Sequence, residues 1–94
     1  MRATLITDFK DVTPDGHIIQ MTIWRVPKPV DPSTHGLKYR LVYIVGGKRV
    51  VGFDNERGKG DHCHLDDEER AYAFVSLDRL IEDFIAEVDR RRSK

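Results

Sequence analysis

The sequence predicts an α+β fold, an antiparallel sheet of four to five strands with one C-terminal helix packed on one face. Three observations lead to this prediction. Residues 17–26 alternate apolar and polar side chains, residues 38–53 contain a hairpin with a Gly-Gly turn, and residues 77–88 show helical periodicity. The chain of 94 residues is long enough for one modest core and too short for two, so residues 1–94 are expected to form a single domain.

The first two strands are expected over residues 3–11 and 17–26, with a turn at Thr13-Pro14-Asp15-Gly16 between them. In the second strand, one face carries Ile19, Met21 and Ile23, and the other carries Gln20, Thr22 and Trp24. Three prolines in residues 27–37 then predict an irregular loop, because proline cannot donate to a sheet ladder.

The third and fourth strands are expected over residues 38–45 and 48–53. Gly46-Gly47 suits a two-residue hairpin turn, because both residues tolerate positive φ. An uninterrupted ladder across this turn would place Tyr43 opposite Val50, Leu41 opposite Gly52 and Tyr39 opposite Asp54.

Residues 54–70 contain almost no apolar side chain and are predicted to be largely a loop, with a short strand over 71–75. Ser76 is a candidate N-cap for a helix. The helix is predicted from an apolar stripe at helical spacing, formed by Leu77, Leu80, Ile81, Phe84, Ile85 and Val88.

Sixteen basic and sixteen acidic residues balance, so the composition is not that of a strongly basic nucleic-acid binder. Residues 38–60 nevertheless carry six Lys/Arg and two Asp/Glu, a local net charge of +4 that can attract an anionic ligand. No apolar run is long enough for a membrane helix, and the N-terminus lacks the apolar core of a signal peptide. The single Cys63 cannot form an internal disulfide, and together these features predict a cytoplasmic protein.

The candidate site lies in residues 54–64. His62 and His64 have side chains that titrate near neutrality, and they share a face if this segment is extended. Arg57 and Lys59 are suited to binding phosphate, and Asp61 could orient one imidazole. This set suits RNA cleavage without a metal, with one histidine as general base and the other as general acid.

Three other interpretations stay open. The segment is a solvated loop without chemistry, or Asp54, Asp61, His62 and His64 bind Zn or Mn in a metal-dependent nuclease. A non-catalytic module could instead bind nucleic acid or a partner protein, with Trp24 stacking on a base unless the loop 27–37 covers it. His17 and His35 lie beside turns and are expected to be solvated, and Cys63 is expected to be a semi-buried thiol.

Several stretches of the sequence resemble the TumE family of toxin–antitoxin toxins. The resemblance covers nearly the whole chain, and its most specific part is the run from Asp54 to His64. It is also carried by residues 38–43, by Tyr72 and Phe74, and by residues 19–27 and 80–84. The family commonly has Arg where this chain has Cys63, which would remove a basic group from the candidate site, and Pro where it has Ala71.

The resemblance implies a toxin that acts as a ribonuclease on cellular RNA, encoded beside a cognate antitoxin. His62 and His64 are the predicted acid and base, and Asp61 and Asp54 the residues that orient them. Arg57, Lys59 and Arg40 are predicted to bind phosphate, with Trp24 as a further RNA contact. No metal and no cofactor are expected. RNA and the antitoxin are the expected partners, a second copy of the chain is considered as another, and no membrane contact is expected.

Overall fold

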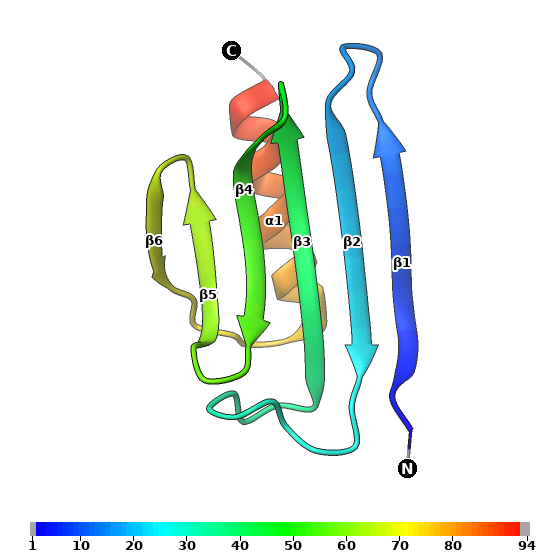
Figure 1. The fold of residues 1–94 in the computed structure, drawn as a ribbon, viewed down its shortest axis with the longest axis vertical. Helices are drawn as coiled ribbons and strands as arrows, with labels where there is room; N and C mark the ends of the chain where they lie inside the picture. The colour runs from blue at the N-terminus through cyan, green and yellow to red at the C-terminus, as the bar shows by residue number, and fades with distance from the viewer. Residues whose placement is uncertain (1, 93–94) are drawn as a thin grey trace.

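The computed structural model describes residues 2–92 and shows an α+β fold with six strands and one helix (Figure 1). The elements, in chain order, are β1 (Thr4–Val12), β2 (Ile18–Arg25), β3 (Leu37–Val45), β4 (Lys48–Glu56), β5 (Gly60–Leu65), β6 (Glu68–Ala71) and α1 (Leu77–Arg92). The predicted fold class is confirmed, but the sheet has six strands rather than four to five.

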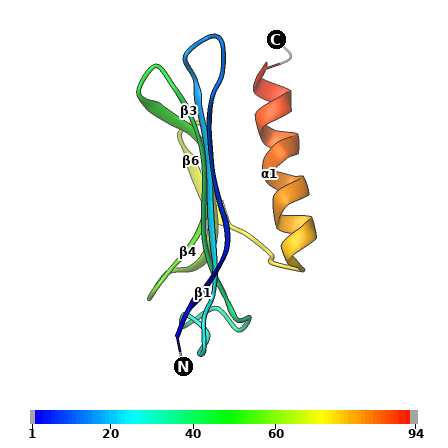
Figure 2. The same ribbon diagram turned by 90° about the vertical axis from the view of Figure 1, so that its right-hand side faces the viewer.

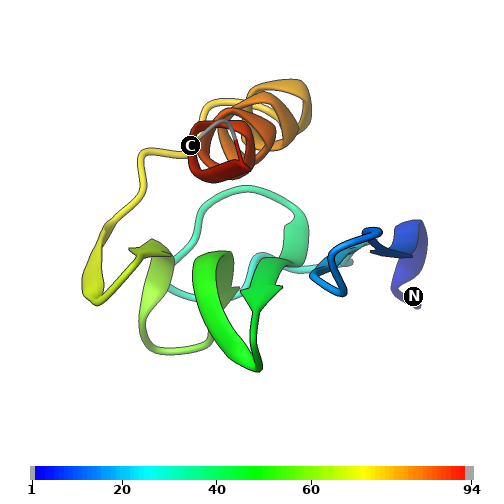
Figure 3. The same ribbon diagram turned by 90° about the horizontal axis from the view of Figure 1, so that it is seen from above.

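The strands form one antiparallel meander in which each strand pairs with its neighbours in the sequence, in the order β1-β2-β3-β4-β5-β6. Helix α1 runs along one face of this sheet and leaves the other face without a covering element (Figure 2). Seen from above, α1 lies over the middle of the sheet, and β1 extends beyond it at one edge (Figure 3). The molecule therefore has a helix face, which holds the core, and an open face.

The predicted C-terminal helix is confirmed together with its cap. Ser76 Oγ accepts a hydrogen bond from the Arg79 N–H at 3.1 Å and so satisfies one of the free donors of the first turn. At the other end Arg91 forms an ion pair with Asp66 at 3.0 Å, which ties the last turn to the β5–β6 turn. Helix α1 is neither long nor apolar enough to cross a membrane.

The core lies between α1 and the middle strands. The helix contributes Leu80, Phe84 and Val88, each at most 4% exposed. The sheet contributes alternate residues of β2 to β5, among them Ile23, Tyr39, Leu41, Tyr43, Val51, Phe53 and Cys63. Because one helix covers one face of the sheet, the core is a single layer.

The Gly46-Gly47 turn forms as predicted, with φ of 58° and 78°, but the register beyond it differs from the expected one. A β-bulge at Val50 shifts the ladder, so that Tyr43 pairs with Val51 and Leu41 with Phe53. An uninterrupted ladder would have directed Val51 and Phe53 away from the helix, because a shift of one residue moves a side chain to the other face. The extra residue brings the apolar residues of both strands to the core.

Residues 54–70 are two further strands rather than a loop. Strand β4 continues to Glu56, and a turn in which Gly58 has φ of 87° leads into β5. Strand β5 is stable despite its polar sequence because it pairs along its length with β4, and its Cys63 packs in the core. The short strand expected over 71–75 is Glu68–Ala71 instead.

Replacing Phe84 with Ala should lower the free energy of unfolding by about 3–5 kcal/mol. The ring is 1% exposed and meets Phe53 edge-on, so its removal leaves a cavity in a single-layer core. The neighbouring Ile85 is 45% exposed, and Ile85→Ala should cost less than about 1 kcal/mol. Denaturant unfolding of the two variants measures this difference, and equal losses would place Phe84 outside the core.

Candidate functional site

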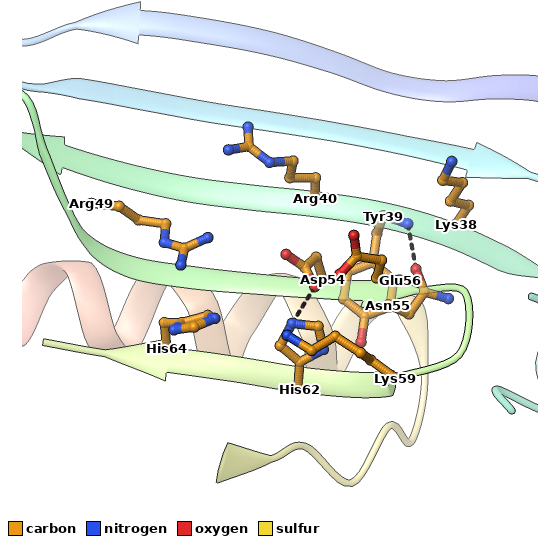
Figure 4. Close-up of a pocket in the computed structure, with 10 residues that line it drawn as sticks. All are labelled: Lys38, Tyr39, Arg40, Arg49, Asp54, Asn55, Glu56, Lys59, His62 and His64. Atoms are coloured by element: carbon orange, nitrogen blue, oxygen red, sulfur yellow. Dashed lines mark hydrogen bonds and ion pairs between the residues drawn. The ribbon is translucent and has the colours of Figure 1, made fainter. Parts of the chain in front are cut away.

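A pocket of about 490 Å³ lies on the open face, over β3, β4 and β5 (Figure 4). Its lining is almost entirely polar and contains both candidate histidines. The lining residues are Lys38, Tyr39, Arg40, Arg49, Asp54, Asn55, Glu56, Lys59, His62 and His64. Four cations and two histidines in one hollow form a surface suited to an anionic ligand.

His62 and His64 share this face, because they are two residues apart on a strand. Their rings meet edge to face with centroids 5.6 Å apart. Cys63 and Asp61, which alternate with them, are directed to the helix face. The prediction of a shared face is confirmed, whereas the interpretation of this segment as a solvated loop is wrong, since His62 is 6% exposed.

Both ring nitrogens of His62 have partners. Its Nδ1 lies 2.9 Å from the carbonyl oxygen of Gly60, which can only accept, so Nδ1 carries a proton. Its Nε2 lies 2.6 Å from Asp54 Oδ1, as the dashed line in Figure 4 shows. That carboxylate oxygen is buried, and among the described residues no side-chain or backbone group reaches it in hydrogen-bond geometry. An acidic and a basic side chain thus lie in close contact at the floor of the pocket, and they are called the Asp54–His62 pair below.

His64 has no such close partner and is the more accessible ring, with 21% of its side chain exposed. Its Nε2 lies 3.7 Å from Glu69 Oε1 on the neighbouring strand β6. Partial burial, followed by the positive charge of Arg49, lowers the pKa of His64. The ring is therefore neutral at pH 7 and has a nitrogen that can accept a proton.

Glu69 connects the histidines to Lys59. Its Oε1 lies 3.0 Å from Lys59 Nζ and 3.7 Å from the Nε2 atoms of both His62 and His64. The hydrogen bond from Lys59 lowers the pKa of Glu69, and the same bond raises the pKa of Lys59. Both side chains are thus charged over the whole neutral range.

The same group could hold a metal ion. One ligand atom from each of His62, His64 and Glu69 falls within 4.8 Å of the others. In addition, the Nδ1 hydrogen bond of His62 to a backbone carbonyl is the kind of support that orients a metal-binding imidazole. Nitrogen and carboxylate ligands of this kind suit Zn among the divalent ions.

Asp61 does not lie at the pocket with the two histidines. Its carboxylate is on the helix face, where it accepts hydrogen bonds from Ser33, from Tyr39 at 2.7 Å and from His35 at 2.6 Å. The Leu37 N–H donates to His35 Nδ1, which leaves the proton on the Nε2 that faces Asp61. Asp61 therefore orients an imidazole as expected, but the imidazole is that of His35.

His35 was expected to be solvated because it lies beside a turn, and this expectation is wrong: only 15% of its side chain is exposed. Its ring stacks on Phe74 with centroids 3.7 Å apart and an angle of 24° between the planes. Burial, followed by the hydrogen bond to Asp61, raises the pKa of Tyr39, so its hydroxyl stays protonated and donates. This buried cluster holds the loop of residues 26–36 against β5.

Asn55 also fixes this loop, from the end of β4. Its side-chain oxygen accepts the Tyr39 N–H at 2.9 Å, and its amide donates to the Leu37 carbonyl at 2.7 Å. The amide also reaches Ser33 Oγ at 3.4 Å. Because Asn55 is 1% exposed and fully hydrogen-bonded, its role is structural: it positions the strand ends that carry Lys38 and His62.

Of the remaining predicted residues, some line the pocket and others lie outside it. Arg40 and Lys59 are lining residues, and Arg40 pairs directly with Asp54 across the ladder. Trp24 is 37% exposed and opposite Lys38, so the proline-rich loop does not cover it. Arg57 lies in the turn after β4 and borders a separate hollow with Lys28 and Val26.

Arg49 is one of the pocket residues that the sequence did not predict. The bulge at Val50 sends its side chain back over Gly52, where a Cβ would lie 2.8 Å from Arg49 Cδ. A glycine in the middle of a strand often marks the close approach of another group. Gly52 was therefore the signal in the sequence that could have indicated the approach of Arg49. No such signal marked Glu69 as a neighbour of the histidines, because it lies in a run of acidic residues.

The effect expected for Cys63 also needs correction. The thiol is 4% exposed in the core on the helix face, and burial raises its pKa. An arginine at this position would start from the face opposite the two histidines, near Glu87 on α1. Cysteine at position 63 consequently takes no basic group away from the pocket.

Asp61 gives a prediction about stability in acid. Burial alone would raise its pKa, but the hydrogen bonds from Ser33, Tyr39 and His35 outweigh burial and lower the pKa. Ionised Asp61 thus stabilises the fold above its unfolded pKa of about 3.9, and this stabilisation is lost as pH falls through the lower folded pKa. Asp61→Asn should cost about 1–3 kcal/mol at pH 7, and the difference from wild type should shrink in strong acid.

Unfolding by urea at neutral and acid pH measures this difference. The matched control is Glu82→Gln, which changes an exposed carboxylate on α1 and should leave stability nearly unaltered at neutral and at acid pH. A difference between wild type and Asp61→Asn that stays constant on acidification would contradict the role assigned to the ionised carboxylate.

A family model described as Toxin TumE matches residues 2–92, which is almost the entire chain. No curated protein and no solved structure matches it. Membership of a toxin family indicates the toxin component of a toxin–antitoxin system and implies a cognate antitoxin as partner. The chain belongs to the TumE toxin family.

Proposed function

We propose that this toxin cleaves RNA by proton transfer in the pocket on the open face. The observation that carries the proposal is the proximity of an accessible neutral histidine, His64, to the Asp54–His62 pair. In the proposed mechanism the neutral imidazole of His64 accepts a proton, and His62, held by Asp54, donates one. The chemistry requires both functions within one site.

His64 is the general base in this proposal. It removes the proton from a ribose 2′-hydroxyl, and the 2′-oxygen attacks the adjacent phosphorus. The bond from phosphorus to the 5′-oxygen of the next nucleotide breaks, and protonated His62 gives its Nε2 proton to that oxygen. The products are a 2′,3′-cyclic phosphate and a free 5′-hydroxyl, so atoms and charge balance with no cofactor.

The cations of the pocket supply the electrostatic part. Arg40 and Arg49 reach the hollow from β3 and β4, on the side opposite the two histidines (Figure 4). Guanidinium groups can bind two phosphate oxygens at once and stabilise the charge that develops on them. Lys38 and the exposed Trp24 extend the surface along the open face, where a neighbouring phosphate and base could bind.

Replacing His64 with Ala should lower RNA cleavage by about 10²–10⁴-fold, the usual contribution of a positioned proton-transfer group. Folding should change little, because the ring is partly exposed and makes no short hydrogen bond. His62→Ala should also lower cleavage, but it leaves Asp54 Oδ1 buried without a partner and should reduce stability as well.

His17→Ala is the matched control, since this ring contacts Tyr43 near the far end of the sheet. Growth arrest and RNA integrity are followed after expression without the antitoxin. If His64→Ala arrests growth like wild type, His64 is not the base. Intact RNA together with measurable RNA affinity would instead favour a non-catalytic binding module.

Arg49→Ala should change both the pH profile and the salt dependence. Arg49 helps to lower the pKa of His64, and a base must be deprotonated to act. In the wild type, the acidic limb of the plot of kcat/KM against pH should therefore lie below the ordinary histidine pKa of about 6.5. In the variant this limb should move to higher pH. A plot of the logarithm of RNA affinity against the logarithm of salt concentration should also become less steep, by about the amount that one phosphate contact contributes.

Two further variants separate the position of Arg49 from its charge. Gly52→Ala adds a methyl group where the Arg49 side chain lies and should reproduce both effects. Arg57→Ala removes a charge outside the pocket and should leave the acidic limb in place. A limb that moves in Arg57→Ala but not in Arg49→Ala would show that the wrong arginine has been assigned.

A metal-dependent nuclease is the second candidate, favoured by the approach of His62, His64 and Glu69 to within 4.8 Å. In that case chelator abolishes cleavage and added Zn or Mn restores it. Glu69→Gln distinguishes the two mechanisms, because it removes a metal ligand but neither the base nor the Asp54–His62 pair. Loss of cleavage in Glu69→Gln that follows metal content would replace the metal-free mechanism.

A further inference from the structure

The two edges of the sheet differ in how they are protected against pairing with another strand (Figure 1). Strand β6 is four residues long and mostly charged. Strand β1, at the other edge, is nine residues long. It carries four exposed large apolar side chains, those of Leu5, Ile6, Phe9 and Val12. A long edge strand with apolar side chains is a surface on which a further strand can pair.

The backbone of β1 offers free hydrogen-bonding groups at alternate residues. The Thr13 N–H donates to the His17 carbonyl at 2.8 Å, so the backbone groups of Thr13 point toward the second strand of the hairpin. Because such groups alternate in an antiparallel ladder, those of Phe9 also point toward β2. Those of Asp8 and Lys10 point outward, and a partner strand can form hydrogen-bonded pairs with them.

The side chains of β1 complement a second copy of the same strand. In an antiparallel pairing with its two-fold axis at Phe9, Asp8 of each copy lies opposite Lys10 of the other. Phe9 then meets its own symmetry mate in a non-hydrogen-bonded pair, where side chains approach most closely. This register agrees with the outward backbone groups, because the pairs of Asp8 with Lys10 are then the hydrogen-bonded ones.

We propose that the free protein forms a homodimer through β1, in this register. Among residues 2–92 neither Asp8 nor Lys10 takes part in an ion pair, so both charges are available to a partner. Strand β1 has a β-bulge at Ile6 and is regular from Thr7 onward, so the continuous part of this register runs over residues 7–11. Ile6 and Val12 flank it at the two ends, and both residues are exposed in the single chain.

Lys10 decides which partner this edge accepts. A lysine in the middle of an edge strand opposes pairing with an arbitrary apolar strand, because its charge would have to be buried. In the proposed register the lysine meets an aspartate instead. The same residue therefore disfavours other strands and favours a second copy.

The dimer would join two six-stranded sheets into one continuous sheet. A two-fold axis perpendicular to the sheet keeps both helices on one face and both pockets on the other. The two cationic pockets then open to the same side, and one polyanionic chain can contact both. The dimer itself does not depend on RNA cleavage and is tested without it.

Charge exchange tests the register directly. Sedimentation of purified protein, from micromolar to millimolar concentration, should show a dimer for wild type. Lys10→Asp alone sets aspartate against aspartate at both symmetry-related pairs, and Asp8→Lys alone sets lysine against lysine. Each single variant should dimerise more weakly by roughly tenfold or more. The double variant Asp8→Lys/Lys10→Asp restores opposite charges and should dimerise like wild type.

An equimolar mixture of the two single variants provides the sharpest measurement, because only a heterodimer then has matched charges at both pairs. The matched control is Glu68→Lys on the β6 edge, which should not alter the association. A wild-type protein that stays monomeric overturns the proposal. So does a dimer that is unaffected by the single charge changes, or one that the mixture fails to restore. A β1 edge that binds only the antitoxin also overturns it.

Discussion

The β-bulge at Val50 is the constraint on which both faces of this protein depend. Strands β3 and β4 each carry apolar residues at alternate positions, and the Gly46-Gly47 turn alone would bring those positions out of phase. One extra residue restores the phase, so that the apolar sets meet under α1. The same extra residue sends Arg49 over Gly52 on the open face. The geometry of the core thus determines which cation enters the pocket.

Strand β5 shows how one polar segment can serve two purposes. Asp61 and Cys63 point to the helix face, where the first anchors the loop of residues 26–36 and the second packs in the core. His62 and His64 point the other way, into the pocket. The hydrogen bonds of Asp61 therefore fix the strand that presents both histidines, although its carboxylate lies on the opposite face from them. This is why a residue with no contact to the pocket can still decide its geometry.

Local patterns in the sequence were sufficient to predict the helix, its Ser76 cap, the first strands and the Gly46-Gly47 turn. They were also sufficient to place His62 and His64 on a common face, because that follows from the period of a strand. The strand character of residues 54–70 could not be predicted, since it comes from pairing with β4 rather than from apolar periodicity. The contact of Asp61 with His35 joins residues 26 positions apart and has no local signal.

The open face has a consequence for how this protein can change over evolutionary time. Trp24, Lys38 and Arg40 are exposed on a sheet surface that no helix covers, so their replacement removes little buried area. Substitutions at such positions usually alter stability by less than about 0.5 kcal/mol. Selection can consequently vary the side chains of this surface, and with them the ligand preference of the proposed site, while the single-layer core stays intact. A fold whose stability lies on one side and whose proposed binding surface lies on the other can diversify its targets without passing through unfolded intermediates.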